Sequence, residues 1–308
     1  SQMAGYDYLS YFDFISFISS SRNSWVQKKS RGGAMSYIFH ILVMINIYVI
    51  LALSLNLLVG YTGLLSLCHA SFYGIGAYVY TLLIMNAGFG FFPSFLLAIL
   101  ASVLLSYVIS IPSLRLRGDY FILATLGFQI ITFTILYNWV DLTRGPYGIP
   151  GIPVPVVFGK SIDSIFSYFI FSGLIALLCV FLFYLIGNSP FGRVLKAIRE
   201  DEILASSSGK NITRFKVTAF AISAGFAAVP GIIFAGYMRY IDPTSFTLSE
   251  SIFILSIIII GGSGNLSGPI LGTVLMIILP EVLRFLAIPD SVAANLRQII
   301  YGLLITLI

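Results

Sequence analysis

One long stretch of this sequence carries no formal charge. From Tyr37 to Leu114 there is no Asp, Glu, Lys or Arg. A transmembrane helix needs about 20 mainly apolar residues, so this stretch could cross a bilayer several times. Its apolar residues are continuous rather than alternating, which disfavours a β-barrel. The whole chain is 58% hydrophobic and 9% charged, unlike soluble domains. We therefore predict an all-α fold, a polytopic transmembrane helical bundle.

The apolar runs predict about 8–10 spans, some of them broken or re-entrant. Their length and continuity are the evidence for each one. The runs cover residues 37–59, 64–87, 92–111, 120–139, 165–187, 216–238, 251–262, 269–286 and 297–308.

Glycine interrupts several of these runs, in "GYTG" (60–63), "GIGAY" (74–78) and "GGSGNLSGP" (261–269). Irregular backbone at membrane depth is tolerated where protein or a water-filled cavity covers it. The glycines therefore indicate either a translocation path or close helix packing. If a path lies at the breaks, the polar residues expected near it are Asn56, Thr62, Ser66, His69, Ser71, Thr125 and Gln129.

Basic residues predict the orientation of the spans. The loop 188–216 carries six Lys or Arg against three acids, whereas the loop 140–164 is balanced. The first loop is therefore predicted to be cytoplasmic and the second external. Burying the nine charges between 193 and 216 at the bilayer centre would cost more than about 20 kcal/mol.

The number of crossings before residue 114 is open at this point. Three spans would place Lys28, Lys29 and Arg31 outside, and an even number would place them inside. We expect the region from Gly60 to Gly76 to be broken into half-helices, giving about ten spans in all. Residues 1–34 form either a leader or cloning remnant upstream of Met35, or an interfacial aromatic-rich helix with a basic end. The domain that follows is 35–308.

The segment "KAIREDEILASSSGKN" (196–211) concentrates charge in an otherwise apolar chain. Its pattern predicts one short amphipathic helix with Ile198, Ile203 and Leu204 on the apolar face, ending at Gly209. From the residues alone, such a helix either docks a partner or is a solvated loop.

Four stretches resemble permeases of the branched-chain amino acid ABC importer family. They are "GYTGLLSLCHASFYGIGAY" (60–78), "LRLRGDYFILATLGF" (114–128), "FGRVLKAIREDEILASSSGKNITRFKVTAFAISA" (191–224) and "GGSGNLSGPILGTVLMIILPEVLR" (261–284). The likeness runs in order from about residue 46 to the end. Permeases for urea and short amides are close relatives of this family.

The resemblance implies a multi-pass permease of the prokaryotic plasma (inner) membrane that imports aliphatic amino acids. Its implied partners are a second homologous permease subunit, two cytoplasmic ATPase subunits and an extracytoplasmic substrate-binding protein. The coupling loop 188–216 would contact the ATPase through Arg199, Glu200, Asp201, Ala205 and Gly209. This chain would bind no cofactor, since ATP and Mg would sit on the ATPase subunits.

The residues give little sign of enzymatic chemistry. "SSGKN" lacks the first glycine and the Ser or Thr of a phosphate-binding loop, so ATP hydrolysis is assigned to partners. The two histidines, His40 and His69, are too few and too distant in sequence for a metal site. A secondary transporter or channel, the alternative from another class, would need coupling acids within the spans, and an intramembrane enzyme would need paired catalytic groups there.

Overall fold

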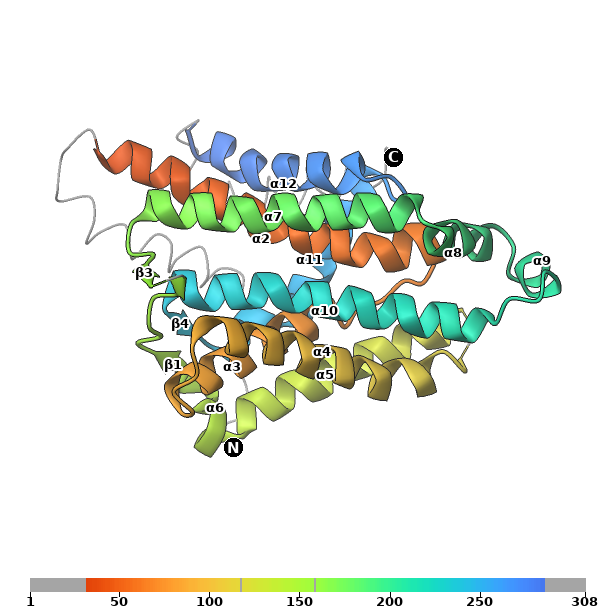
Figure 1. Cartoon of the computed structure of the whole chain (residues 1–308), viewed down its shortest axis with the longest axis horizontal. Helices are drawn as coiled ribbons and strands as arrows, with labels where there is room; N and C mark the ends of the chain where they lie inside the picture. Colours follow the sequence, from red (N-terminus) through yellow and green to blue (C-terminus); the bar gives the residue numbers. More distant parts are fainter. Residues whose placement is uncertain (1–31, 117, 158, 286–308) are drawn as a thin grey trace, which may run out of the picture.

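The computed structural model describes residues 32–116, 118–157 and 159–285, and in this part of the chain it is a bundle of helices (Figure 1). Five helices are long and apolar enough to cross a membrane, and three shorter ones accompany them. The prediction of a polytopic helical bundle is therefore confirmed. The long helices are α2 (Gly32–Thr62), α4 (Phe91–Ser113), α5 (Asp119–Asn138), α7 (Ile165–Asn188) and α10 (Ile212–Met238), and the shorter ones are α3 (His69–Met85), α11 (Leu248–Gly261) and α12 (Ser267–Phe285).

Short elements gather at the two ends of the bundle (Figure 1). One end holds α6 (Val140–Thr143), the 3-10 helices η1 (Gly145–Tyr147) and η2 (Pro243–Phe246), and two small antiparallel sheets. The sheets pair β1 (Ile149–Pro150) with β4 (Tyr240–Ile241) and β2 (Val156–Val157) with β3 (Lys160–Ser161). The opposite end holds α8 (Pro190–Glu200) and α9 (Glu202–Ser207). Basic residues cluster around α8 and α9, so the positive-inside rule assigns this end to the cytoplasmic side.

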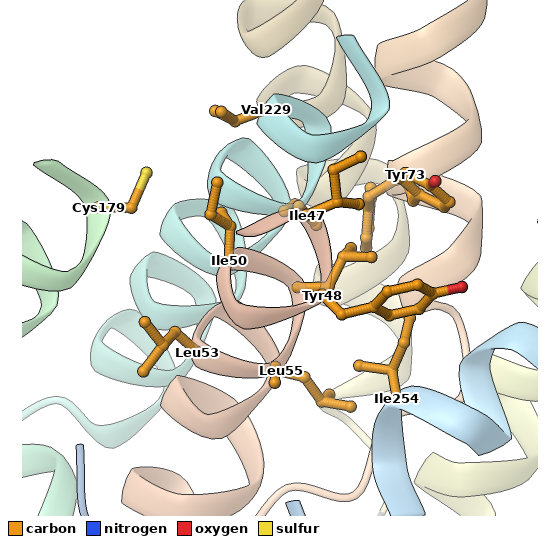
Figure 2. Close-up of a cluster of buried hydrophobic side chains, with 14 of the residues drawn as sticks. Ile47, Tyr48, Ile50, Leu53, Leu55, Tyr73, Cys179, Val229 and Ile254 are labelled. Carbon is orange, nitrogen blue, oxygen red and sulfur yellow. The ribbon is translucent and has the colours of Figure 1, made fainter. Parts of the chain in front are cut away.

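Helices α2 and α10 form the centre of the bundle. The most apolar stretch of α10 is 78% buried and that of α2 is 61% buried, whereas that of α7 is 22% buried. Figure 2 shows the side chains of α2 reaching neighbours on opposite sides, with Ile50 toward Cys179 of α7 and Tyr48 toward Ile254 of α11. Other helices therefore contact α2 on more than one side.

Glycine allows α3 and α10 to cross at very short range. A Cβ atom placed on Gly231 of α10 would lie 2.1 Å from the backbone oxygen of Tyr73. A Cβ atom on Gly76 of α3 would lie 2.4 Å from the backbone oxygen of Ala228. The backbones therefore pack against each other directly, as small residues permit in membrane bundles.

The chain is broken between α2 and α3, within the expected region Gly60–Gly76. Helix α2 ends at Thr62, the next six residues are not helical, and α3 begins at His69. Helix α2 starts at the outer end, because His40 Nδ1 lies 2.7 Å from the hydroxyl of Tyr237, near the end of α10, and α3 and α4 follow it before residue 114. Residues 1–31 and the predicted span 297–308 lie outside the described residues.

Replacing Gly231 with Ala should destabilise the bundle by at least about 1–3 kcal/mol, because the new methyl group meets rigid backbone of α3. Thermal unfolding of the purified protein in detergent measures the effect. Gly127→Ala in α5 is the control, since a Cβ atom there has no neighbour within 4 Å. Equal melting temperatures for the two variants would contradict the close crossing.

Candidate functional site

The start of α3 lies inside the bundle, where its free backbone N–H groups cannot reach bulk water. Cys68, His69 and Ala70 are fully buried, and Cys68 provides no side-chain cap. An unsatisfied backbone group is costly in an apolar medium, so these groups need partners from elsewhere. The N–H of Ala70 donates to Ser251 Oγ of α11 at 2.9 Å. The N–H of Leu67 donates to Thr125 Oγ1 of α5 at 3.1 Å. Other helices therefore cap the broken one.

Gln129 of α5 is the centre of this capping. Its Oε1 accepts from both the N–H and the hydroxyl of Ser71, at 2.9 and 2.8 Å. Its Nε2 donates to the backbone oxygen of Phe246 in η2 at 2.8 Å. Gln129 is 1% exposed, so one buried amide joins α3, α5 and the outer segment before α11. Thr125, Gln129 and Ser71 thus lie together, as expected for residues around one break.

His69 and Ser66 lie at the same break but face other partners. His69 Nε2 lies 2.6 Å from Ser54 Oγ of α2, and the hydroxyl of Ser223 in α10 donates to the backbone oxygen of Ser54 at 2.6 Å. Ser66 Oγ lies 3.3 Å from Cys68 Sγ within the break itself. His69 therefore joins the break to the central helices.

Asn56 and Thr62 lie nearer the cytoplasmic end and form a separate group. Asn56 Oδ1 accepts from the N–H of Gly264 at 3.0 Å, and its Nδ2 donates to the backbone oxygen of Asn265 at 2.9 Å. These two bonds hold the turn between α11 and α12 against α2. Thr62 Oγ1 donates to the backbone oxygen of Leu58 in its own helix at 2.7 Å.

All seven predicted path residues are buried and hydrogen bonded to protein groups in this conformation. Their side chains are uncharged hydrogen-bonding groups. That they line a path stays a prediction.

Two buried polar residues at the start of α11 are not among the residues predicted from the sequence. Ser251 is fully buried and caps α3, and Glu250 is buried with its Oε1 accepting from the Tyr48 hydroxyl at 2.6 Å. Both stand in the segment "TLSESIF" (247–253), whose polar residues directly precede an apolar run. Polar residues directly before an apolar run are the sequence pattern by which Glu250 and Ser251 could have been identified.

The cytoplasmic segment forms two helices, so the prediction of one short helix is wrong. Asp201 has extended backbone (φ −154°, ψ 109°) and separates α8 from α9. Its carboxylate accepts from the N–H groups of Ile203 and Leu204 at 2.8 and 3.0 Å, the bonds of a helix N-cap. As a result Ile198 is buried against the bundle, whereas Ile203 and Leu204 are 78% and 67% exposed.

The five predicted ATPase-contact residues differ in what they touch. Asp201 caps α9, Ala205 is buried, and Gly209 ends the turn after α9 with a φ of +73°. Glu200 is exposed, and Arg199 Nη1 donates to the backbone oxygen of Gly60 at 2.6 Å. Their contact with an ATPase stays a prediction. No group of three His, Cys, Asp or Glu that could hold a metal ion is found within 32–116, 118–157 and 159–285.

Comparison with known proteins identifies a family of transport permeases. Residues 37–308 match the family described as the permease component of branched-chain amino acid transport systems. The high-affinity branched-chain amino acid transport system permease protein LivM of Salmonella typhimurium is 40% identical over 284 residues, which are 85% of this chain and 66% of that protein. LivM of Escherichia coli is 40% identical over 261 residues, 77% of this chain and 61% of that protein. A probable LivM of Methanocaldococcus jannaschii is 29% identical over 195 residues, 61% of this chain and 56% of that protein.

The chain therefore spans about two thirds or less of the length of these relatives. No solved structure gives a significant match.

Gln129→Leu should destabilise the protein by about 1–3 kcal/mol or more, because the N–H of Ser71 and the oxygen of Phe246 lose a buried partner together. Thermal unfolding in detergent measures the loss. Thr134→Val is the control on the same helix, since Thr134 is exposed. A Gln129→Leu protein as stable as Thr134→Val would show that the capping contributes little.

Proposed function

The chain belongs to the permease-component family of branched-chain amino acid transport systems, and from this premise we propose that it is a permease subunit of an ATP-binding cassette importer. In this proposal it forms part of the translocation path for branched-chain, aliphatic amino acids in the prokaryotic plasma (inner) membrane. The proposed partners are a second homologous permease subunit, two cytoplasmic ATPase subunits and an extracytoplasmic substrate-binding protein. The chain itself needs no cofactor, since ATP and Mg bind the ATPase subunits.

The main observation in support of an ATPase partner is the exposed pair Ile203 and Leu204. Figure 1 shows α9 projecting beyond the cytoplasmic ends of the membrane helices. Two large aliphatic side chains at its surface stand between acidic residues (200–202) and serines (206–208), and an apolar interface core with a polar rim has this composition.

Helix α9 is also held firmly enough to serve as a docking element. Asp201 caps its first turn, and Lys216 Nζ of α10 lies 2.7 Å from Glu202 Oε2. A surface ion pair contributes at most about 1 kcal/mol, so its role is orientation more than stability. A preorganised apolar surface loses less entropy when a partner binds.

The substrate is proposed from the names of the relatives, with urea or a short amide as the alternative from the same family. The break around Gln129 offers neutral hydrogen-bonding groups, which suit weak contacts that release a solute. The observation that favours a different class, a secondary transporter, is the buried carboxylate of Glu250, because acids at such positions serve ion coupling.

Transport in proteoliposomes tests the function. We expect uptake of labelled leucine that requires ATP, the ATPase subunits and the binding protein together, and that excess isoleucine or valine inhibits. Urea should not compete. Uptake driven by a proton or sodium gradient with this chain alone would contradict the importer proposal and favour the role of Glu250 in coupling.

The docking surface is tested by the double variant Ile203→Ser, Leu204→Ser. Each buried aliphatic side chain contributes about 1.5–3 kcal/mol, so ATPase affinity should fall by roughly a hundredfold or more. Co-purification of the ATPase from membranes measures this. Leu116→Ser is the control, since Leu116 is exposed in the cytoplasmic turn after α4. Undiminished co-purification with the double variant would exclude α9 as the docking element.

A further inference from the structure

Arg199 makes a contact that a simple docking role does not explain. It stands at the end of α8, and its Nη1 donates to the backbone oxygen of Gly60 at 2.6 Å. Gly60 lies in the last turn of α2, where backbone oxygens have no partner within the helix. A guanidinium placed there satisfies one of these oxygens and also interacts favourably with the C-terminal end of the helix dipole.

Three glycines lie around this contact: Gly60 in the last turn of α2, Gly63 in the break after it, and Gly264 in the turn between α11 and α12. A Cβ atom on Gly63, in the break after α2, would lie 3.5 Å from Arg199 Cγ. A Cβ atom on Gly264, in the turn between α11 and α12, would lie 2.6 Å from Arg199 Nη1. A Cβ atom on Gly60 would lie 2.4 Å from the backbone nitrogen of Gly264. We call Gly60, Gly63 and Gly264 the arginine seat.

The two breaks meet at this seat and are fastened to each other. Asn56 bonds both to Gly264 and to Asn265, so the turn between α11 and α12 moves with the end of α2. Gly63 and Gly264 have φ angles of +72° and +89°, a backbone region that side-chain-bearing residues rarely adopt.

Helix α8 reaches the end of α2 through Arg199 and through Lys196, whose Nζ lies 4.8 Å from the ring centroid of Tyr61, and the guanidinium of Arg199 also lies beside Gly264. Its apolar side, with Leu195 and Ile198, is buried against the bundle, and α9 with its exposed pair follows directly after Asp201. If α8 and α9 move, the guanidinium of Arg199 moves with them and displaces both the end of α2 and the α11–α12 turn.

We propose that Arg199 is a positioning residue that transmits movement of α8 and α9 to the cytoplasmic breaks at Gly60–Gly63 and Gly264, and so couples ATP hydrolysis to opening of the path. This inference rests on the proposed importer function. In this proposal Arg199 acts on the chain's own backbone instead of through the ATPase contact that the family resemblance implies, so we expect loss of its side chain to uncouple transport without removing the ATPase.

The test compares Arg199→Gln with Arg193→Gln in the reconstituted importer. Arg193 is a matched control, because its Nη1 donates to the backbone oxygen of Asn188 at 3.0 Å and contacts neither break. For Arg199→Gln we expect normal ATPase co-purification, continued ATP hydrolysis, and a fall of about tenfold or more in substrate taken up per ATP hydrolysed. Arg193→Gln should keep the wild-type ratio.

A second pair of variants distinguishes loss of the Arg199 contact from the effect of backbone strain in the α11–α12 turn. Gly264→Ala displaces the guanidinium, whereas Gly262→Ala, at a φ of +90° with no neighbour within 4 Å, imposes similar strain in the same turn. The uptake-to-ATP ratio should fall with Gly264→Ala and much less with Gly262→Ala. In the double variant Arg199→Gln, Gly264→Ala the ratio should fall no further than in the single variants, because both changes remove the same contact.

Three results would overturn the inference. Arg199→Gln could keep the wild-type ratio, it could lose ATPase co-purification and so be a contact residue, or the two glycine variants could be equally impaired. A wild-type importer without ATP-driven uptake would instead contradict the proposed function itself.

Discussion

The need to satisfy backbone hydrogen bonds away from water governs the arrangement of this bundle. A continuous helix satisfies its own groups, but the chain interrupts its helix between Thr62 and His69. The N–H groups exposed by that interruption must find partners at membrane depth. Side chains from α5 and α11 supply them, chiefly Gln129 and Ser251. The break therefore fixes which helices surround α3 and which polar residues those helices carry.

The same requirement acts on carbonyl groups at the cytoplasmic end. The last turn of α2 leaves oxygens without helical partners, and Arg199 reaches one of them from α8. Because the donor comes from the segment that carries the exposed α9 pair, satisfying the end of α2 also connects the surface to the interior. The connection needs no buried ion pair, and a charged donor on a neutral oxygen avoids the desolvation of a second charge.

Much of the architecture could be predicted from residue patterns, because lipid imposes a strict length and apolarity on each span. The break could be located from "GYTG", but its partners could not, since Ser251 and Gln129 are distant in sequence and meet only in the packed bundle. The prediction of a single helix within 196–211, ending at Gly209, was wrong because the apolar periodicity of this segment does not register the capping preference of Asp201. Asp followed by Glu, Ile and Leu is equally a helix start, and it turns Ile203 away from Ile198.

Hydrophobicity alone could not separate the central helices from the peripheral ones. Helix α7 is the most apolar of the five long spans and the least buried, whereas α10 is less apolar and the most buried. In water this order would be reversed. In a membrane the surroundings are as apolar as the core, so burial depends on close backbone approach. The small residues of "AISAGFAAVPGIIFAG" (221–236) allow that approach, and Gly231 meets the backbone of α3 through them. Small residues therefore mark α10, whereas α2, the other central helix, is buried through large aliphatic side chains such as Ile50 and Leu51.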